Sequence, residues 1–190
     1  GQNKMVSETP YAVVIDKDPA MRLSLRHLLS VICGHACDAF SDLEGAQAYM
    51  RAEVGPSLFI IGSQVSDWGA GLRQLASKEG CFVVFLDRQE NTQNAEEAFI
   101  AGADDVVRVP FTLREFALRL RVRVGLLSDE YGNQLLQDPR NWDHEAQIAG
   151  RAGLTDAEAQ VAHILMSKNG DIVSRDALSY AIDGRAWDYG

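Results

Sequence analysis

Long hydrophobic runs and cysteine are both scarce in this chain of 190 residues. No run of about 18 apolar residues occurs, which argues against a membrane span. The polar start GQNKMVSETP lacks the apolar centre of a secretory signal. The three cysteines are an odd number and do not indicate a disulfide framework. The sequence therefore predicts a cytoplasmic protein with reduced thiols and no membrane association.

Motifs for metal binding and catalysis are missing as well. Cys33, His35 and Cys37 lie close together, but zinc sites usually need four ligands in paired motifs, and no second pair follows. The sequence contains no HExxH pair, no P-loop, no GxGxxG and no arrangement typical of a catalytic triad. We therefore predict no metal, no cofactor and no enzymatic activity.

Basic residues are outnumbered by acidic ones, with 18 Lys+Arg against 27 Asp+Glu and a formal net charge of −9. Nucleic-acid-binding surfaces are usually basic, so the average composition argues against one. The charge is uneven, because residues 1–127 carry 13 Lys+Arg and 16 Asp+Glu, whereas residues 128–190 carry 5 and 11. Most of the net acidity thus lies in the last third of the chain.

Residues 11–127 alternate between two patterns. Apolar runs typical of buried strands cover residues 11–15, 35–40, 57–61, 81–86 and 105–109. Helical spacing covers residues 20–32, a segment after the capping box at 41–44, and residues 69–78, 92–101 and 112–127. Asp18 is expected to cap the first helix, with Pro19 at its first position. Five successive β-α units predict an α/β fold with a doubly wound parallel sheet.

The composition changes after residue 127. Residues 1–10 are expected to be disordered, residues 11–127 to form one domain, and the polar stretch 128–134 to be a linker. In residues 135–190, a second capping-box pattern at 155–158 opens a helix, and Ser174 begins another. We expect this last segment to be a small, mostly α-helical unit.

Residues 11–127 resemble a response-regulator receiver domain. The segment AGADDVVRVPF at 101–111 is similar to the "AGADDYLTKPF" that closes such domains, and VIDKDP at 14–19 is similar to the acidic opening "VVDDDP". LTDAE at 154–158 and VSRDAL at 173–178 are similar to "LTPTE" and "VSREEL" of an OmpR-type winged-helix effector. The resemblance implies a flavodoxin-like (βα)5 receiver followed by the N-terminal part of a DNA-binding domain.

The chain departs from this resemblance at the phosphorylation pocket. Gly62 stands where such receivers carry the phosphoacceptor aspartate, so no acyl phosphate can form there. Asp16 retains one of the two acids that hold Mg²⁺, whereas Lys17 replaces the other. Asp87 stands in place of the hydroxyl residue, and Val109 in place of the lysine. We predict a degenerate pocket that receives no phosphoryl group.

Two interpretations of the altered pocket are open. The functional residues could have been lost without replacement. Alternatively, Lys17 and Asp87 both project into the vacated space and form an internal ion pair that holds the domain in one state without phosphate.

The resemblance also implies a two-fold homodimer through the fourth helix, the fifth strand and the fifth helix. Asp105, Glu115 and Arg119 match positions that pair across that interface, and Phe99 and Ala117 would lie in its apolar patch. We expect a closed, self-complementary dimer that forms without phosphorylation.

The sequence stops where the recognition helix of the resembled effector would begin, so we expect that helix and the wing to be absent from residues 135–190. DNA binding is then expected of a full-length parent and not of this fragment. The predicted function is a transcriptional regulator that acts without phosphorylation. The alternative is a pseudo-receiver adaptor that binds a protein partner, such as a kinase, RNA polymerase or another regulator, and no DNA.

Overall fold

A computed structural model describes residues 9–124, 134, 137–139 and 148–149 of the chain. Its main feature is a parallel sheet of five strands: β1 (Ala12–Ile15), β2 (Cys37–Phe40), β3 (Leu58–Gly62), β4 (Phe82–Asp87) and β5 (Asp105–Arg108). The strand order is β2-β1-β3-β4-β5, so the direction of winding reverses between β1 and β3. Such a reversal is where open α/β sheets place their sites.

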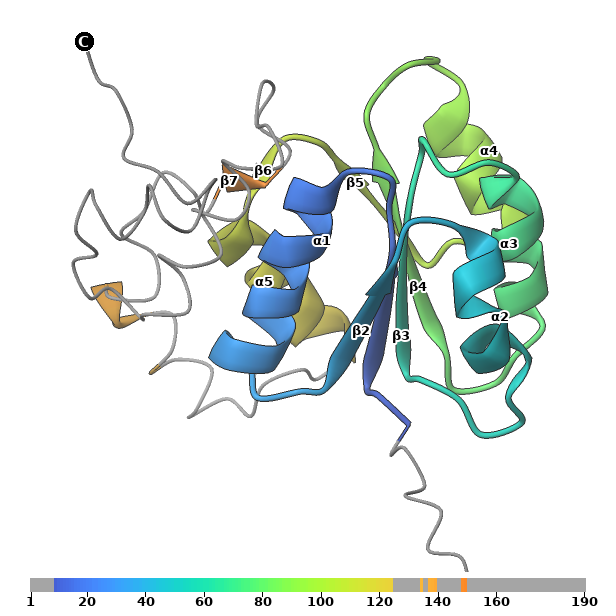
Figure 1. The fold of residues 1–190 in the computed structure, drawn as a ribbon. Coiled ribbons are helices and arrows are strands. Elements are labelled where there is room, and N and C mark those ends of the chain that lie inside the picture. The colour runs from blue at the N-terminus through green and yellow to red at the C-terminus, as the bar shows by residue number, and fades with distance from the viewer. Residues whose placement is uncertain (1–8, 125–133, 135–136, 140–147, 150–190) are drawn as a thin grey trace, which may run out of the picture.

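Helices cover both faces of the sheet (Figure 1). One face is covered by α1 (Pro19–Arg26), its continuation η1 (His27–Ile32) and α5 (Leu113–Val124). The other is covered by α2 (Leu43–Arg51), α3 (Trp68–Ala76) and α4 (Asn94–Ala101). The doubly wound sheet predicted from the sequence is confirmed, and its strands begin and end within two residues of the predicted limits.

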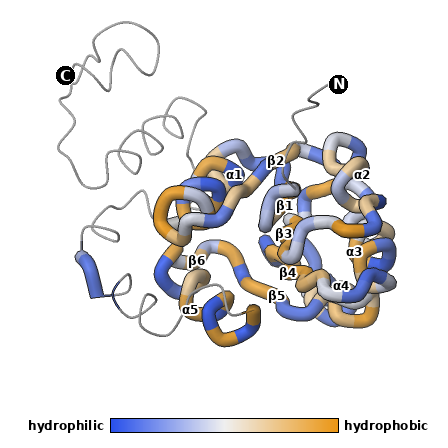
Figure 2. Tube along the Cα trace, turned by 90° about the horizontal axis from the view of Figure 1, so that it is seen from below, coloured by the Kyte–Doolittle hydropathy of each residue, from blue (hydrophilic) through white to orange (hydrophobic). Residues whose placement is uncertain are grey.

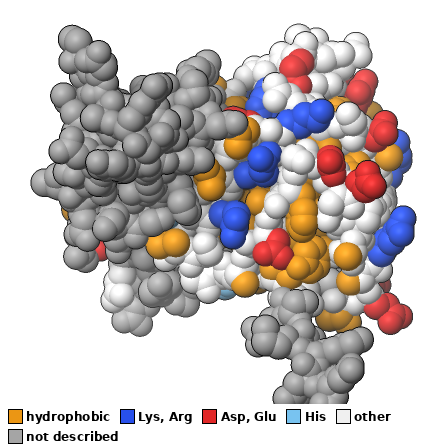
Figure 3. Space-filling model, viewed as in Figure 1, with side chains coloured by type: hydrophobic (Ala, Val, Ile, Leu, Met, Phe, Trp, Pro, Cys, Tyr) orange, Lys and Arg blue, Asp and Glu red, His pale blue; other side chains and the backbone are white. Residues whose placement is uncertain are grey.

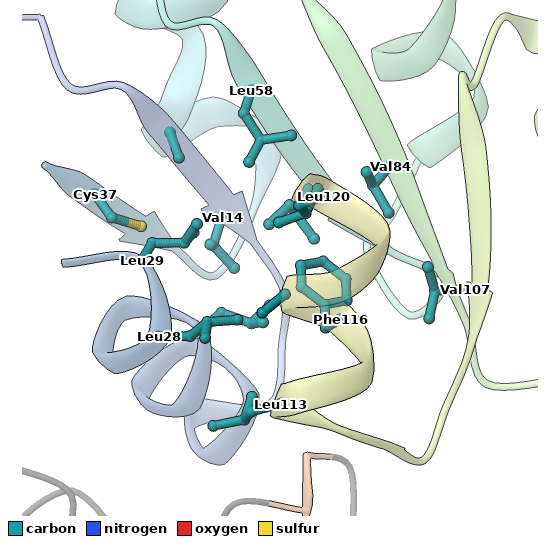
Figure 4. Packing of buried hydrophobic residues seen from close by; sticks show 14 of the residues in the cluster. Val14, Leu28, Leu29, Cys37, Leu58, Val84, Val107, Leu113, Phe116 and Leu120 are labelled. Carbon is teal, nitrogen blue, oxygen red and sulfur yellow. The ribbon is translucent and has the colours of Figure 1, made fainter. Parts of the chain in front are cut away.

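Two apolar cores hold these layers together, one on each face of the sheet. On the α1 and α5 side, Phe116 and Leu120 of α5 belong to the same buried cluster as Val14, Leu58 and Val84 of three strands (Figure 4). Figure 2 shows hydrophobic and hydrophilic residues alternating around the helices, as amphipathic packing on a sheet requires. The strands are buried on both sides, which explains their continuous apolar runs.

The first two helices start at aspartates. The Asp18 Oδ1 atom accepts a hydrogen bond from the backbone N–H of Ala20 at 2.9 Å, and Pro19 occupies the first helical position, as predicted. In α2 the cap is Asp42, which accepts from the backbone N–H of Gly45 at 2.9 Å. The capping-box pattern at 41–44 thus predicted the helix start to within one residue, since it makes Ser41 the cap and the structure uses Asp42.

One predicted helix differs in kind. The spacing predicted a single helix over residues 20–32, but the α-helix ends at Arg26 and a π-helix follows. There the backbone N–H of Cys33 donates to the Leu28 carbonyl, five residues earlier, at 2.9 Å. The wider turn lets His27, Leu28 and Leu29 all be buried, which a regular α-helix achieves less readily for three successive residues.

Two further short strands lie outside the main sheet. β6 (Phe111–Thr112) pairs antiparallel with β7 (Ile148–Ala149). Most of the predicted linker and effector, residues 128–190, lies outside the described residues, as do residues 1–8. In the part that is described, no helix has the length and apolar character needed to cross a bilayer.

Candidate functional site: the strand-end pocket

The candidate site lies at the carboxyl ends of β1, β3 and β4, beside the reversal of strand order. Asp16 follows β1, Gly62 ends β3, and Asp87 ends β4, with Arg88 immediately after it. Because β3 lies between β1 and β4, residues from the two outer strands can meet above Gly62.

The centre of the pocket is an ion pair between Asp16 and Arg88. The guanidinium donates from Nη1 to Oδ2 at 2.9 Å and from Nη2 to Oδ1 at 2.8 Å. The Asp16 side chain is completely buried, and that of Arg88 is 12% exposed. This two-point contact is the geometry in which arginine binds carboxylates most strongly. A second acid, Asp18, lies 3.9 Å from the same guanidinium.

Opposing effects act on the Asp16 carboxyl. Burial raises its pKa, because water no longer stabilises the charged form. The hydrogen bonds and positive charge of Arg88, together with the backbone N–H of Asp18 at 2.8 Å, act in the opposite direction. Burial outweighs them, so the pKa of Asp16 lies above its ordinary value even with Arg88 in place.

Gly62 is the residue that leaves room for this pair. A Cβ atom at position 62 would lie 2.1 Å from Asp16 Oδ2 and 2.9 Å from Arg88 Nη1. The first distance is far below any van der Waals contact, so a larger residue would displace the carboxylate. The missing side chain at position 62 and the ion pair above it are therefore two parts of one arrangement.

The loop that follows β4 is tied to this arrangement. Ser63 Oγ donates to Glu90 Oε1 at 2.7 Å and accepts from the backbone N–H of Arg88 at 2.9 Å. Asp87 Oδ1 accepts from the backbone N–H of Gln89 at 2.8 Å, and Gln89 has the unusual φ of 63°. These contacts fix the turn that aims the Arg88 side chain back over β3.

The predicted ion pair between Lys17 and Asp87 is wrong. Lys17 is exposed, Asp87 is buried and bound to the Gln89 backbone, and no ion pair joins Lys17 to Asp87 among the described residues. Consecutive residues in extended chain point to opposite sides, so with Asp16 directed inward, Lys17 is directed outward. The cation comes instead from Arg88.

Of the other residues predicted for the pocket, two lie together and one does not contribute to it. Asp16 and Gly62 are brought together, whereas Val109 is buried at 7% exposure in the apolar core and adds no polar group. No role was assigned to Arg88 from the sequence. The available signal was its position directly after β4, next to a strand whose glycine leaves space for a long side chain.

Of the predicted dimer residues, some lie at the surface and one is buried. Phe99 is 52% exposed, Glu115 is exposed, and Arg119 lies 3.5 Å from Asp105 of its own chain. Ala117 was expected in a surface patch, but it is 1% exposed and belongs to the core that α5 forms with α1. The apolar residues that α5 does expose are Leu118 and Val122.

The described residues offer no metal centre, and the face drawn in Figure 3 carries charges of both signs. Among the described residues, no three His, Cys, Asp or Glu side chains are placed to hold a metal ion. On the face in Figure 3, acidic and basic side chains are interspersed over the described surface.

Comparison with known proteins points to one group of regulators. No protein-family model matches the chain. It is 28% identical over 176 residues to the transcriptional regulatory protein PhoP of Escherichia coli K12, which covers 87% of this chain and 77% of PhoP. It is 27% identical over 174 residues to the DNA-binding response regulator MtrA of Mycolicibacterium smegmatis, covering 87% and 75%.

Solved structures agree on the fold. A response regulator receiver protein from Burkholderia phymatum matches with a TM-score of 0.54 at 22% identity, over 64% of this chain and 99% of that one. The orphan response regulator HP1043 of H. pylori matches with a TM-score of 0.52 at 18% identity, over 60% and 94%. The chain is thus similar in sequence to the response regulators PhoP and MtrA, and its five-stranded parallel sheet with its helices has the CheY-like fold of a receiver domain.

Proposed function

We propose that this chain is a transcriptional regulator of the two-component response-regulator type whose receiver acts without phosphorylation. The observation that carries the proposal is the buried Asp16–Arg88 ion pair, which fills the space above Gly62 where the resembled receivers carry their phosphoacceptor. Of the two interpretations of the altered pocket, the proposal takes the one in which an internal ion pair occupies it, with Arg88 as the cation.

The chemistry of the pocket supports this reading. Phosphoryl transfer requires a nucleophile and, in the resembled receivers, a bound Mg²⁺ that neutralises the phosphate oxygens. Position 62 offers no nucleophile, and the nearest hydroxyl, Ser63, is buried and holds two hydrogen bonds. Arg88 already neutralises Asp16, so the carboxylate has both oxygens engaged and is not free to bind a cation.

DNA binding and dimer formation complete the proposal. We assign DNA binding to the winged-helix effector that residues 135–190 resemble, since PhoP and MtrA are a transcriptional regulatory protein and a DNA-binding response regulator. We assign the dimer contact to α4, β5 and α5, where Phe99, Ile100 and Val122 are exposed at 52%, 86% and 76%. Exposed apolar residues near one another often mark protein interfaces.

The same exposed residues would also serve an adaptor that binds a protein partner and no DNA. The two functions differ in what the whole natural protein retains. A regulator selects specific DNA fragments from a genomic library, and does so equally well with and without a phosphodonor. Failure to select any DNA, together with stoichiometric binding of a kinase, RNA polymerase or another regulator, would favour the adaptor.

The claim that the receiver is not phosphorylated has its own test. The protein is incubated with acetyl phosphate and Mg²⁺, with a phosphorylatable PhoP-type receiver as the positive control. We expect its intact mass and sedimentation coefficient to stay unchanged while the control gains mass. A stoichiometric mass gain would overturn the proposal.

A further inference from the structure

A short strand from beyond the receiver is seated on the receiver itself. β7 begins 24 residues after α5 ends, in the segment expected to belong to the effector, yet it pairs with β6 at the start of α5. The pairing is antiparallel, with Phe111 opposite Ala149 and Thr112 opposite Ile148. β7 also lies against α1 (Figure 1).

The receiver's half of this pair is firmly held. Phe111 is 4% exposed, belongs to the core between α1 and α5, and stacks on Phe116 with ring centres 4.9 Å apart. Thr112 Oγ1 accepts from the backbone N–H of Glu115 at 3.1 Å and so caps the start of α5. β6 is therefore held in place by the receiver, and its backbone edge is the one that β7 joins.

The position of β7 relates it to the strand-end pocket. β6 follows β5 after only Val109 and Pro110, and α1 follows directly on the loop that carries Asp16. β7 thus lies at the carboxyl edge of the sheet, the same edge at which Arg88 closes the pocket. Its contact uses backbone pairing, the mode by which sheets bind extended segments of other proteins or domains.

The connecting length allows the same chain to supply the strand. α5 has 12 residues and spans about 18 Å, so a chain leaving its end must return by about that distance to reach β6. The 23 residues between Val124 and Ile148 could extend to about 75 Å. A two-residue pairing has little strength of its own, and a tether of this length supplies it with a millimolar effective concentration.

We propose that β6 and α1 form a docking surface for the segment at Ile148–Ala149 of the same chain, which joins β6 by β-strand addition. The docking holds the segment that follows α5 against the carboxyl edge of the receiver, so the two predicted domains are not independent units on a free linker. This inference concerns the contact alone and stands whether or not the proposed function is correct.

Disulfide trapping in the full chain tests the contact. Opposed residues in antiparallel strands have Cα atoms about 4.5–5.5 Å apart, within the range that a disulfide bridges. The variant Thr112→Cys/Ile148→Cys is oxidised at low concentration and mapped by peptide mass spectrometry. Ser77→Cys/Ile148→Cys is the matched control, because Ser77 is exposed and follows α3 at the opposite edge of the sheet.

We expect the 112–148 pair to close within one chain at least about tenfold faster than the control pair, as tethered, opposed thiols should. Equal rates for the two pairs would overturn the proposal. So would disulfides that join isotopically labelled and unlabelled chains, because a second copy would then supply the strand.

Hydrogen exchange gives a readout that needs no new thiols. Proline at position 149 cannot donate to a strand pair, whereas valine keeps the strand. We expect Ala149→Pro to reduce the exchange protection of the amides at 111–112 several-fold, and Ala149→Val to retain it. Unchanged protection in Ala149→Pro would contradict docking at β6.

Discussion

Arg88 places a fixed positive charge beside the buried Asp16 carboxylate, at the point where the resembled receivers hold Mg²⁺. A bound metal leaves with chelators and offers open coordination positions to a phosphate. A guanidinium does neither, since it is part of the chain and its two terminal nitrogens already donate to Asp16. At the residue scale, the proposed function therefore places a permanent charge where the resembled receivers have a reversible ligand.

Removal of Arg88 should leave an unpaired buried carboxylate. For Arg88→Gln we expect a loss of about 3–5 kcal/mol in the free energy of unfolding at pH 7, measured by urea denaturation. The loss should grow with pH. Burial already raises the pKa of folded Asp16 above its unfolded value, and the variant removes the Arg88 contributions that lower it. The folded variant then holds its proton over a wider pH window than the unfolded chain, so its stability falls as pH rises through that window.

The control is the double variant Asp16→Asn/Arg88→Gln, in which no carboxyl remains to titrate at this site. Its stability should lack the loss with rising pH that the Asp16 titration gives to Arg88→Gln. If Arg88→Gln and the unmodified protein lose stability in parallel as pH rises, Asp16 is not the group that Arg88 neutralises.

The three cysteines should react only slowly with thiol reagents in the folded state. Burial raises the pKa of Cys33 and Cys37 to about 12 and that of Cys81 to about 11. The thiolate is the reactive form, and very little of it exists at pH 7.5. We expect a thiol reagent to label none of the three within minutes in native protein, and all of them in urea. Fast labelling of Cys33 at neutral pH would contradict its burial.

At the scale of elements, the sequence predicted most of the sheet, because buried parallel strands have uninterrupted apolar sequences such as Val13 to Ile15. It predicted the start of α1 because Asp18 and Pro19 act locally. The π-helix was missed, since its extra residue per turn changes hydrogen bonding without changing which residues are apolar.

In the pocket too, some features follow from a single residue and others depend on contacts between distant residues. The absence of a side chain at position 62 could be read from Gly62 alone. The identity of the cation could not, because Arg88 reaches Asp16 across 72 positions in sequence, through a turn set by Gln89 and Ser63. Lys17 was nearer in sequence to the acidic group but faces solvent.

The end of α4 offers a test of packing between elements. Gly102 has φ of 113°, and a Cβ there would lie 2.4 Å from Ala76 Cβ of α3. We expect Gly102→Ala to lower the free energy of unfolding by about 2–4 kcal/mol, from backbone strain and overpacking together. Gly80 has φ of 74° with nothing within 4 Å of its Cβ position, so Gly80→Ala should lose only about 1 kcal/mol. If thermal or urea unfolding shows equal losses of stability for Gly102→Ala and Gly80→Ala, α3 moves to accommodate the added methyl group.

At the scale of the whole molecule, the exposed apolar residues of α4 and α5 should decide its oligomeric state. We expect the unmodified protein to sediment as a dimer, and Ile100→Glu or Val122→Glu to shift it to monomer, because a charge buried at a two-fold contact faces its own copy. Val54→Glu is the matched control, since Val54 is 85% exposed but lies in the loop between α2 and β3.

Sedimentation velocity over a range of concentrations measures this directly. A protein that is monomeric at the highest concentration would remove the proposed dimer. A dimer that Val54→Glu disrupts and Val122→Glu spares would move the contact to the loop between α2 and β3.

Gly62 also governs the order in which this sequence can change. An aspartate introduced at position 62 would carry a Cβ 2.1 Å from Asp16 Oδ2, so it cannot enter while the pair with Arg88 stands. Position 88 must change first, and that step by itself leaves the buried Asp16 carboxylate without its ion-pair partner. Each single step back towards a phosphorylatable receiver is thus unfavourable, although the two together need not be. Under the proposed function, this epistasis would keep the pocket in its present form through the geometry of Asp16, Gly62 and Arg88.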